Sequence, residues 1–395
     1  MSEKSNFRSE VSDFGLYLIG EDAPDEEDGR KIWHIKAESE GGQALTIRMN
    51  GRPLPLNFED LFQFSIHRTC VPLRFTAASY SHTGSTVEEE QRGDIVVQWA
   101  PAAARDKPVF LLTEGGWLPA GPWVNAEFLI MDRNIVIDLE KLVAKTDRDL
   151  DLEPERVFWF DLLRMTNTKI HPFVFGLEGR VSRRPEMAEF LHEIARANSI
   201  LEAFFGTSAV VKLDVVRQQG AAGLLRDLKT YLRKAHPFLR KVLPLLHPSP
   251  KSARHESIYR TILEAANEFK LGQRSMLVLL AVSLLFQGSV QRTPESKLNP
   301  GRLILKPKSP FTDKALYNAS FDAWLIELLA GGNALSASGI VLVTQDKGLV
   351  SFWAGLQPSN LRMENRVPTA NIQFVRAHFP AMPDELFIDF SARFQ

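Results

Sequence analysis

The chain has 395 residues, of which 44% are hydrophobic, and its formal net charge at pH 7 is −1. Since a single core stops growing at roughly 250–300 residues, this length predicts two domains or one domain with large insertions. Because the net charge is near zero, the protein as a whole has no positive field that attracts polyanions, but local basic patches are not excluded. The single cysteine, Cys70, excludes an internal disulfide and a cysteine-rich zinc site, which fits a reducing compartment.

The apolar segments of the sequence are short. No basic stretch followed by an apolar segment begins the sequence, and no apolar run approaches the ~18 residues that cross a bilayer. The longest, 275–286, has the length of a buried core helix. We therefore expect a soluble cytoplasmic protein that does not enter a membrane.

The first part of the chain changes character near residue 30. Residues 1–30 are polar, and six acids fall among the eight positions 21–28, which predicts a solvated acidic tail. The region 31–124 predicts a small β-rich N-terminal domain, with 114–123 as its exit linker. Its expected β segments, separated by Gly, Pro, Asn and Asp turns, are 31–38, 44–49, 73–80 and 94–101.

Strands and helices alternate from residue 125 onward. The expected strands are 128–131, 170–176, 340–344 and 372–377, and the expected helices are 136–145, 154–165, 185–205, 319–330 and 348–356. Strands that are apolar on both faces and alternate with helices predict an α/β fold with a mostly parallel sheet covered by helices. The second predicted domain is 125–395, with a long helical insertion at 207–300.

Acidic residues stand where the strands of this sheet end. Asp132, Glu178 and Asp346 each follow an expected strand, and Asp322 is expected in the first turn of the helix before the 340–344 strand. Ligand and catalytic groups of open α/β sheets lie at such strand ends. Four gathered carboxylates repel one another by several kcal/mol in a low dielectric unless they are protonated or neutralised. Mg²⁺ or Mn²⁺ would neutralise them and supply a water for phosphodiester hydrolysis.

Three stretches resemble the motifs of PIN-domain nucleases. In "IMDRNIVIDL" (130–139) a strand ends in Asp-x-Asn before a helix, as in the first motif of that family. In 319–349 an Asp-Ala pair is followed by a helix and then by a strand ending in Thr-x-Asp, as in the closing motifs. "FVFGLEGR" (173–180) is similar to the second strand with its acid. The resemblance covers about 125–205 and 310–385.

The resemblance implies a PIN-like three-layer domain and a metal-dependent endonuclease. It makes Asp132, Glu178, Asp322 and Asp346 the catalytic and metal-binding residues, and it implies that Asn134 and Thr344 orient these acids through hydrogen bonds. The reaction would be hydrolysis by an activated water. The family favours RNA over DNA and includes toxins of toxin–antitoxin pairs, so a ribonuclease toxin with an inhibitory protein partner is also implied.

The chain departs from the family at Arg133, where Thr or Ser is usual. Arg133 would touch a phosphate or point away from the site. Three of the four acids also have a structural interpretation, since Asp132 could cap a helix and Asp322 and Asp346 could complement helix dipoles. The order and spacing of the motifs together favour the metal site. For the second-strand acid, the alternatives to Glu178 are Glu186, Glu189 and Glu193.

A basic region lies within the predicted insertion. Residues 212–260 hold eleven Lys or Arg against three acids, a local net charge of +8. Bases on one helix face attract phosphates without sequence preference, although a solvated helix face is the alternative. The predicted nucleic-acid-binding residues are Arg133, Arg226, Lys229, Arg233, Lys234, Arg240 and Lys241. A second basic stretch, 292–314, precedes the helix of Asp322. No phosphate-binding glycine loop is present, so no nucleotide cofactor is expected.

Three rival functions remain on the sequence alone. The first is a catalytically inactive PIN-like scaffold that binds nucleic acid or a protein. The second is a phosphohydrolase with Asp132 as nucleophile, which would require an acid at position 134, where the chain has Asn. The third is an interaction protein whose N-terminal β-rich domain carries the function.

Overall fold

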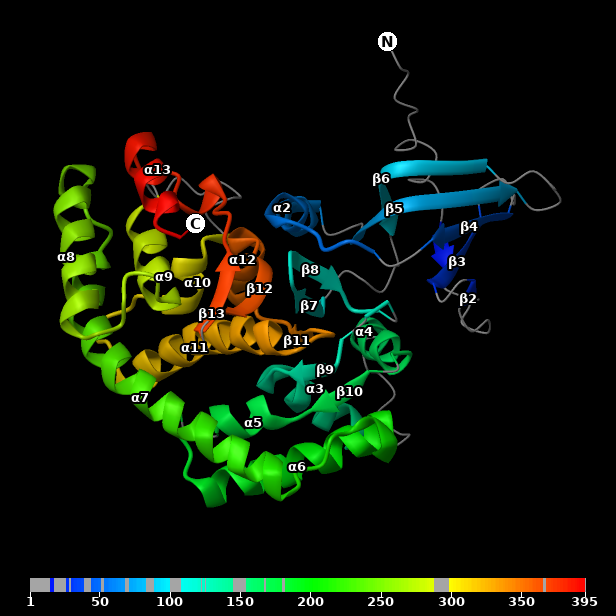
Figure 1. Ribbon diagram of the computed structural model, residues 1–395, viewed down its shortest axis with the longest axis horizontal. Coiled ribbons are helices and arrows are strands. Elements are labelled where there is room, and N and C mark those ends of the chain that lie inside the picture. The colour runs from blue at the N-terminus through cyan, green and yellow to red at the C-terminus, as the bar shows by residue number, and fades with distance from the viewer. Residues whose placement is uncertain are drawn as a thin grey trace, which may run out of the picture. The chain divides into compact units, whose positions relative to one another are not determined.

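In the computed structural model the chain forms two compact units (Figure 1). The first comprises the described residues within 1–109, 118–124 and 151–166, and the second those within 110–117, 125–150 and 167–395. The structure describes residues 15–17, 26–27, 30–38, 44–50, 53–67, 71–82, 89–99, 108–121, 123–124, 126–144, 154–166, 168–179, 182–287, 298–364 and 367–394. Most of the predicted acidic tail lies outside these ranges.

The first unit contains an antiparallel sheet of order β1–β3–β4–β5–β6, with β2 also paired to β3. The four predicted β segments lie in β3, β4, β5 and β6. The strands are β1 (Gly15–Tyr17), β2 (Glu26–Glu27), β3 (Arg30–Glu38), β4 (Ala44–Asn50), β5 (Val71–His82) and β6 (Glu89–Trp99).

Among its described residues, the first unit also contains the helices α2 (Phe58–His67) and α4 (Pro154–Arg164). The helix α4 was predicted, but α2 was not. Asn57 and Asp60 exchange backbone-to-side-chain hydrogen bonds of 3.0 Å in both directions. This reciprocal pattern satisfies free N–H groups in the first turn of α2 and marks its start.

The second unit is built on a mixed sheet of order β10–β9–β11–β7–β8, which establishes an α/β fold. The strands β10 and β11 flank β9 and run parallel to it, whereas β7 is antiparallel to β11. The predicted strands 128–131 and 340–344 are confirmed as β9 and β11. The bounds are β7 (Phe110–Thr113), β8 (Gly116–Pro119), β9 (Phe128–Met131), β10 (Lys169–His171) and β11 (Ile340–Thr344).

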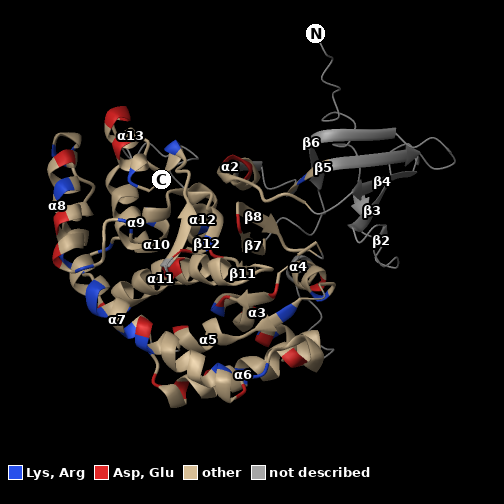
Figure 2. Ribbon diagram, in the orientation of Figure 1, with Lys and Arg blue, Asp and Glu red and all other residues tan. Residues whose placement is uncertain are grey.

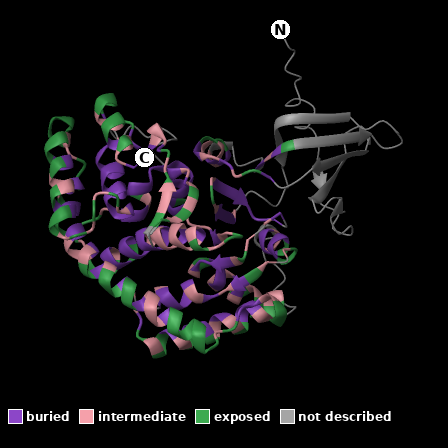
Figure 3. Cartoon of the chain, viewed as in Figure 1, coloured by how far each residue is buried: buried purple, intermediate pink, exposed green. Residues whose placement is uncertain are grey.

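Helices cover this sheet. The helix α5 contacts β9, α3 and α11 contact β11, α12 contacts β7, and α6 packs on α3 and α5 (Figure 1). Buried residues line the faces where these elements meet (Figure 3). The bounds are α3 (Arg133–Val143), α5 (Phe173–Glu178), α6 (Met187–Phe205), α10 (Pro300–Leu305), α11 (Asp313–Leu335), α12 (Lys347–Leu356) and α13 (Asp384–Ala392).

The region predicted as an insertion is helical. It contains α7 (Val215–Leu246), α8 (His255–Glu268) and α9 (Met276–Leu285). Every residue of α9 is buried, as predicted for an apolar segment of core-helix length. The helix α7 packs along α11. Within the described ranges, no helix combines the length and the apolar character needed to cross a membrane.

The prediction of a strand over 170–176 is wrong. The strand β10 ends at His171, and α5 occupies the apolar run, with four successive buried residues from Val174 to Leu177. A short run buried on all sides cannot be assigned to helix or strand by periodicity. Pro172 decides it, because proline cannot donate to a strand ladder but is tolerated at a helix start.

Two further expectations differ from the structure. The predicted linker 114–123 instead contributes β8, which lies next to β7 in the sheet. The predicted strand 372–377 is wrong, because the strands here are β12 (Ser359–Glu364) and β13 (Val367–Asn371), and a short 3-10 helix follows at Arg376–His378. The second unit also includes residues 110–117, and the first includes residues 151–166, so the unit boundaries differ from the predicted division at residue 125.

Candidate active site

Asp132 and Thr344 lie level with each other at the ends of two parallel strands. The pairing of β9 with β11 ends at Met131 and Val343, so the next residue of each strand reaches the same edge. The Thr344 Oγ1 donates to Asp132 Oδ2 over 2.6 Å, and the same Oγ1 accepts from the Asp346 backbone N–H over 2.9 Å. The hydrogen bond expected between Thr344 and an acid is therefore present.

Asp132 occupies the N-cap position of α3, but its side chain makes no capping hydrogen bond. The structural interpretation of this residue therefore does not account for its carboxylate. Burial raises the pKa of Asp132 from 3.8 to about 6, the hydrogen bond from Thr344 opposes the rise, and the charge of Asp346 adds to it. Only 5% of the residue is exposed.

Asp346 is a helix cap and a candidate ligand at once. Its Oδ1 accepts from the backbone N–H groups of Gly348 at 2.7 Å and Leu349 at 3.1 Å, at the start of α12. A Cβ added to Gly348 would lie 2.9 Å from that oxygen, so glycine permits the close approach. The Asp346 Oδ2 accepts no hydrogen bond from a described residue, which leaves one oxygen for a ligand.

Glu178 is the last residue of α5 and is half-buried. Burial raises its pKa from 4.5 to about 8, and the charges of Asp132 and Asp346 add to the rise, against the charge of Arg133. The Tyr317 hydroxyl lies 3.2 Å from the Glu178 carbonyl oxygen and 3.3 Å from that of Leu177. Tyr317 therefore fixes the end of α5, and with it the backbone from which Glu178 projects.

The alternative acids on the next helix are engaged elsewhere. Glu186 pairs with Arg184 at 2.5 Å and Glu189 with Arg183 at 2.5 Å, while the buried Glu193 lies 3.5 Å from Arg133 and from Arg196. None of the three contributes to the pKa shifts of Asp132, Glu178 or Asp322. Glu178 is therefore the residue of this region that belongs with the other acids.

The placement of Asp322 in a first helical turn is wrong. The helix α11 begins at Asp313, so Asp322 lies in its interior, where a dipole interaction does not explain it. Burial raises the pKa of Asp322 well above 3.8, and the charges of Asp346, Glu178 and Asp132 raise it further. The charge of Lys306 lowers it. Lys306 adopts φ 44°, a left-handed conformation that few L-residues take.

The four acids thus come from four separate segments. The charges of Asp132, Glu178 and Asp346 act on Asp322, and those of Asp132 and Asp346 act on Glu178. Their oxygens are the ligands that Mg²⁺ and Mn²⁺ prefer, and a cation would remove the repulsion between them. The donor chemistry therefore fits a hard divalent ion. Within the described part of the chain, however, no three Asp, Glu, His or Cys side chains are arranged to ligate one ion.

Among the described residues, the side chains of two predicted residues form no hydrogen bond or ion pair with these four acids. Asn134 is exposed on α3, and no hydrogen bond among the described residues joins it to an acid. Arg133 turns toward α5 and α6, where its guanidinium lies 4.5 Å from the Phe175 ring centroid and 3.3 Å from the Phe175 carbonyl oxygen. Its ion pair with Glu193 is nearly enclosed, with 12% and 5% of the side chains exposed. Arg133 is therefore a packing residue.

Lysines and arginines are spread along α7 (Figure 2), and the predicted ones divide into two groups by their ion pairs. Arg240 pairs with Asp313 at 2.5 Å, Lys241 pairs with Glu268, and the charge of Lys234 acts on the buried Glu327. The exposed residues Arg226, Lys229 and Arg233 form no ion pair with a described residue. Their i, i+3, i+7 spacing places these three on one face of α7.

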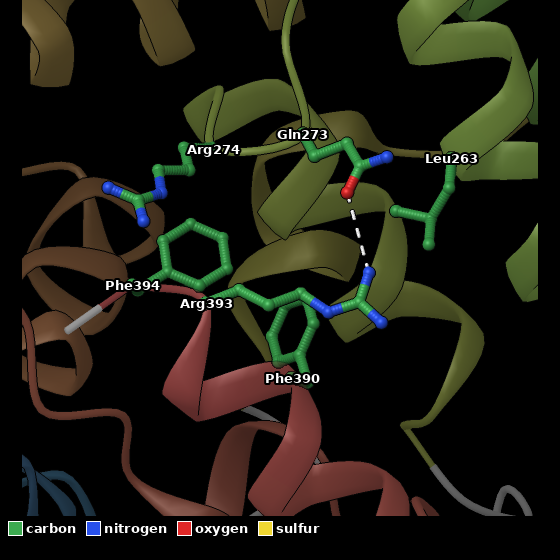
Figure 4. A pocket seen from close by; sticks show the side chains of 6 residues that line it. All are labelled: Leu263, Gln273, Arg274, Phe390, Arg393 and Phe394. Atoms are coloured by element: carbon green, nitrogen blue, oxygen red, sulfur yellow. Dashed lines mark hydrogen bonds between the residues drawn. The ribbon is translucent and has the colours of Figure 1, made fainter.

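A charged pocket of about 270 Å³ lies apart from the acids, between α13 and the segment before α9 (Figure 4). The Arg393 guanidinium points toward Gln273 Oε1 at 3.4 Å and also pairs with Asp389 at 2.6 Å, and Arg274 projects beyond the Phe394 ring. The pocket shares no residue with the acidic cluster. Its lining residues are Leu263, Gln273, Arg274, Phe390, Arg393 and Phe394.

Sequence reasoning missed Tyr317 and Lys306 as neighbours of the acids. Lys306 stood in the basic stretch 292–314, but no pattern marked it from the other bases there. Tyr317 carries no signal in the sequence, because its contact with α5 depends on the tertiary fold. Comparison of the chain with family models, with curated proteins and with solved structures finds no match.

Proposed function

We propose that the protein is a metal-dependent nuclease with a PIN-like catalytic domain. The observation that carries the proposal is that Asp132, Glu178 and Asp346, from the ends of β9, α5 and β11, lie near enough for their charges to act on the buried Asp322 of α11. A cluster of partly buried carboxylates is unfavourable without cations, so a function that binds cations accounts for its presence.

The four acids would hold Mg²⁺ or Mn²⁺. A bound divalent ion lowers the pKa of its water and stabilises charge on a phosphodiester. The chain's own groups then have distinct roles. The Thr344 hydroxyl orients the Asp132 carboxylate, the α12 backbone holds Oδ1 of Asp346, and Tyr317 holds the end of α5 that carries Glu178. Lys306 adds positive charge beside Asp322.

The substrate class is a further part of the proposal. The resemblance to PIN-domain nucleases favours RNA over DNA, a cytoplasmic location, a toxin-type ribonuclease and an inhibitory protein partner. The exposed bases Arg226, Lys229 and Arg233 support a polyanionic substrate, since they stand on one face of α7 without acidic partners among the described residues.

The deciding experiment is cleavage of labelled single-stranded RNA and DNA with EDTA, Mg²⁺ or Mn²⁺. We expect cleavage only with a divalent ion and its loss in Asp132→Asn and Asp346→Asn. Asparagine is as good an N-cap as aspartate, so Asp346→Asn removes the charge while it retains the capping of α12. The matched control is Asp138→Asn, a pair partner of Lys141 on α3. Cleavage that persists in both site variants, or without metal, would refute the proposal.

A second candidate is an inactive PIN-like scaffold that binds nucleic acid or a protein. The absence of a metal-ligating group of three among the described side chains favours it. The same experiment separates the two candidates. Oligonucleotide binding by the parent protein without any cleavage product under Mn²⁺ is the outcome expected for the scaffold.

A further inference from the structure

A shallow basic pocket of about 270 Å³ lies where the connection between α5 and α6 meets α7. Three of its lining side chains are basic: Arg184 from the connection and Lys229 and Arg233 from α7. The remaining lining residues are Leu232, His236 and Pro237. Two segments that are distant in the sequence therefore present their charges to one space.

The positive charge of this pocket is only partly neutralised. Lys229 and Arg233 are exposed and form no ion pair with a described residue, and Arg233 lies 3.5 Å from the Thr230 hydroxyl. Arg184 pairs with Glu186, whose side chain is 69% exposed, so an anion could replace this partner at little cost. Burial, with the charge of Arg240, lowers the pKa of His236, so the imidazole is neutral at pH 7.

The pocket is connected to the acidic cluster through α5 and α11. Glu178 ends α5, and Arg184 stands before α6 on the same short connection. Tyr317 on α11 donates to the backbone at Glu178, and the charges of Arg184 and Arg183 act on the Tyr317 phenol. The helix α7, which carries Lys229 and Arg233, packs along α11. Arg184 of the pocket and Glu178 of the acidic cluster are therefore linked by one short connection and by their common neighbour Tyr317.

We propose that Arg184, Lys229 and Arg233 form a subsite for one backbone phosphate of a single-stranded nucleic acid that extends to the acidic cluster. This inference rests on the proposed nuclease function. Guanidinium and ammonium groups bind phosphate oxygens through charge-assisted hydrogen bonds, and three groups from two segments fix a position more narrowly than one charged helix face. Leu232 and Pro237 add apolar groups to the lining of the pocket.

The proposed subsite includes only some of the residues that the sequence predicted to bind nucleic acid. It includes Lys229 and Arg233, adds Arg184, and excludes Arg133, whose guanidinium packs against Phe175. It also excludes Arg240 and Lys241, which are held by Asp313 and Glu268. Substitutions of the subsite residues should therefore lower the nucleic-acid affinity more than substitutions of the excluded residues.

The first test measures binding of a fluorescein-labelled single-stranded RNA of about 12 nucleotides, within the usual site size, by anisotropy. All variants carry Asp132→Asn, so that the strand is not cut. We expect Lys229→Glu with Arg233→Glu to lower the affinity at least 10-fold. The dependence of log affinity on log salt should fall by about 0.7 for each lost phosphate contact.

The matched control is Lys251→Glu with Arg254→Glu, which makes the same charge change at exposed positions of the α7–α8 connection. It should change the affinity less than 2-fold. Equal losses in the two double variants would overturn the subsite, since they would indicate only a general field. Absence of binding by the parent at low salt would also overturn it. Thermal melting of each variant shows that the surface changes leave the fold intact.

A second test locates the phosphate. Single neutral methylphosphonates are placed in turn along a single-stranded DNA probe. We expect one or two positions to lower the affinity of the parent, and this loss to vanish in the Lys229→Glu, Arg233→Glu variant. A uniform loss along the strand would overturn the subsite. Failure of the nuclease proposal is distinguishable, because it appears as absent cleavage under Mn²⁺ whatever the binding results are.

Discussion

The hydroxyl of Thr344 donates a 2.6 Å hydrogen bond to Oδ2 of Asp132, and so joins two residues that lie far apart in the sequence. The parallel register of β9 and β11 places them side by side. The same Thr344 oxygen accepts from the backbone N–H of Asp346. One hydroxyl therefore fixes the side chain of one acid and the backbone of another.

Replacement of Thr344 by Val keeps the shape of the fully buried side chain and removes this hydroxyl. The Asp132 carboxylate then loses a donor and the Asp346 N–H loses its acceptor. We expect a loss of about 1–3 kcal/mol in the free energy of unfolding, measured by urea denaturation. Since the bond lowers the pKa of Asp132, the acidic limb of the cleavage pH profile should move to higher pH.

Thr344→Ser is the control for that prediction, because it retains the hydroxyl and loses only a methyl group. Its pH profile should match that of the parent. A Thr344→Val profile that does not move would show that the hydroxyl does not control the ionisation of Asp132.

The metal-free protein should become less stable as the pH rises from about 6.5 to 8. Below this range the burial of His171 and His378, which lowers their pKa values from 6.5 to about 4 and about 3, acts in the opposite direction. Folding raises the pKa of Asp132 from 3.8 to about 6 and that of Glu178 from 4.5 to about 8. The folded state thus binds more protons than the unfolded state in this window, so its stability falls as the pH rises. In EDTA, the melting temperature should fall by about 2–4 °C for each kcal/mol lost.

Mn²⁺ should reverse this trend at pH 7.5, because an ion that binds only the folded state raises the melting temperature. The Asp132→Asn variant should show both a flatter pH dependence and a smaller response to Mn²⁺. A melting temperature that rises from pH 6.5 to 8 in EDTA would contradict the burial of repelling carboxyl groups.

Asp322→Asn should stabilise the metal-free protein at pH 8 and abolish cleavage. Burial and three neighbouring acids make the charge of Asp322 unfavourable, and Lys306 only partly opposes this. Single stabilising substitutions commonly gain about 0.5–2 kcal/mol, and we expect a gain of this size here. Urea denaturation at pH 8 and pH 5 tests this, with a smaller gain expected at pH 5, where the carboxyl of the unfolded chain is closer to protonation.

The control is Asp161→Asn, an exposed residue whose weak pair with Arg164 spans 3.6 Å. It should change the stability by less than about 0.5 kcal/mol. Destabilisation by Asp322→Asn at pH 8 would instead assign Asp322 a structural role within α11.

The sequence predicted the candidate site best where an acidic or hydroxyl residue stands at the end of an apolar strand. Asp132 and Thr344 were predicted at strand ends, and both strands are present with the expected bounds. The predicted position of Asp322 in a first helical turn was wrong. The apolar pattern began only at residue 319, whereas α11 starts at Asp313, where the Thr312 side chain caps it. The neighbours Tyr317 and Lys306 could not be predicted, since tertiary packing brings them to the acids.

Short apolar runs were the part of the fold that could not be assigned to helix or strand from the sequence. The segment 170–176 divides at Pro172 into β10 and α5, and burial on all sides removed the periodicity that separates helix from strand. The strand β7 was not expected beside β11, because an antiparallel strand from before residue 125 joins the parallel set only through tertiary pairing. The alternation of elements nevertheless predicted the α/β class correctly.

Arg133 provides a last contrast between sequence and structure, because sequence reasoning placed it among the nucleic-acid-binding residues. Its guanidinium lies against the Phe175 ring and near Glu193. We expect Arg133→Gln to lower the free energy of unfolding by about 3 kcal/mol, since it leaves a buried carboxylate with a weaker partner. Adding Glu193→Gln should recover part of this loss. The affinity for single-stranded RNA should change less than 2-fold, and a large loss of affinity with unchanged stability would restore Arg133 to the nucleic-acid interface.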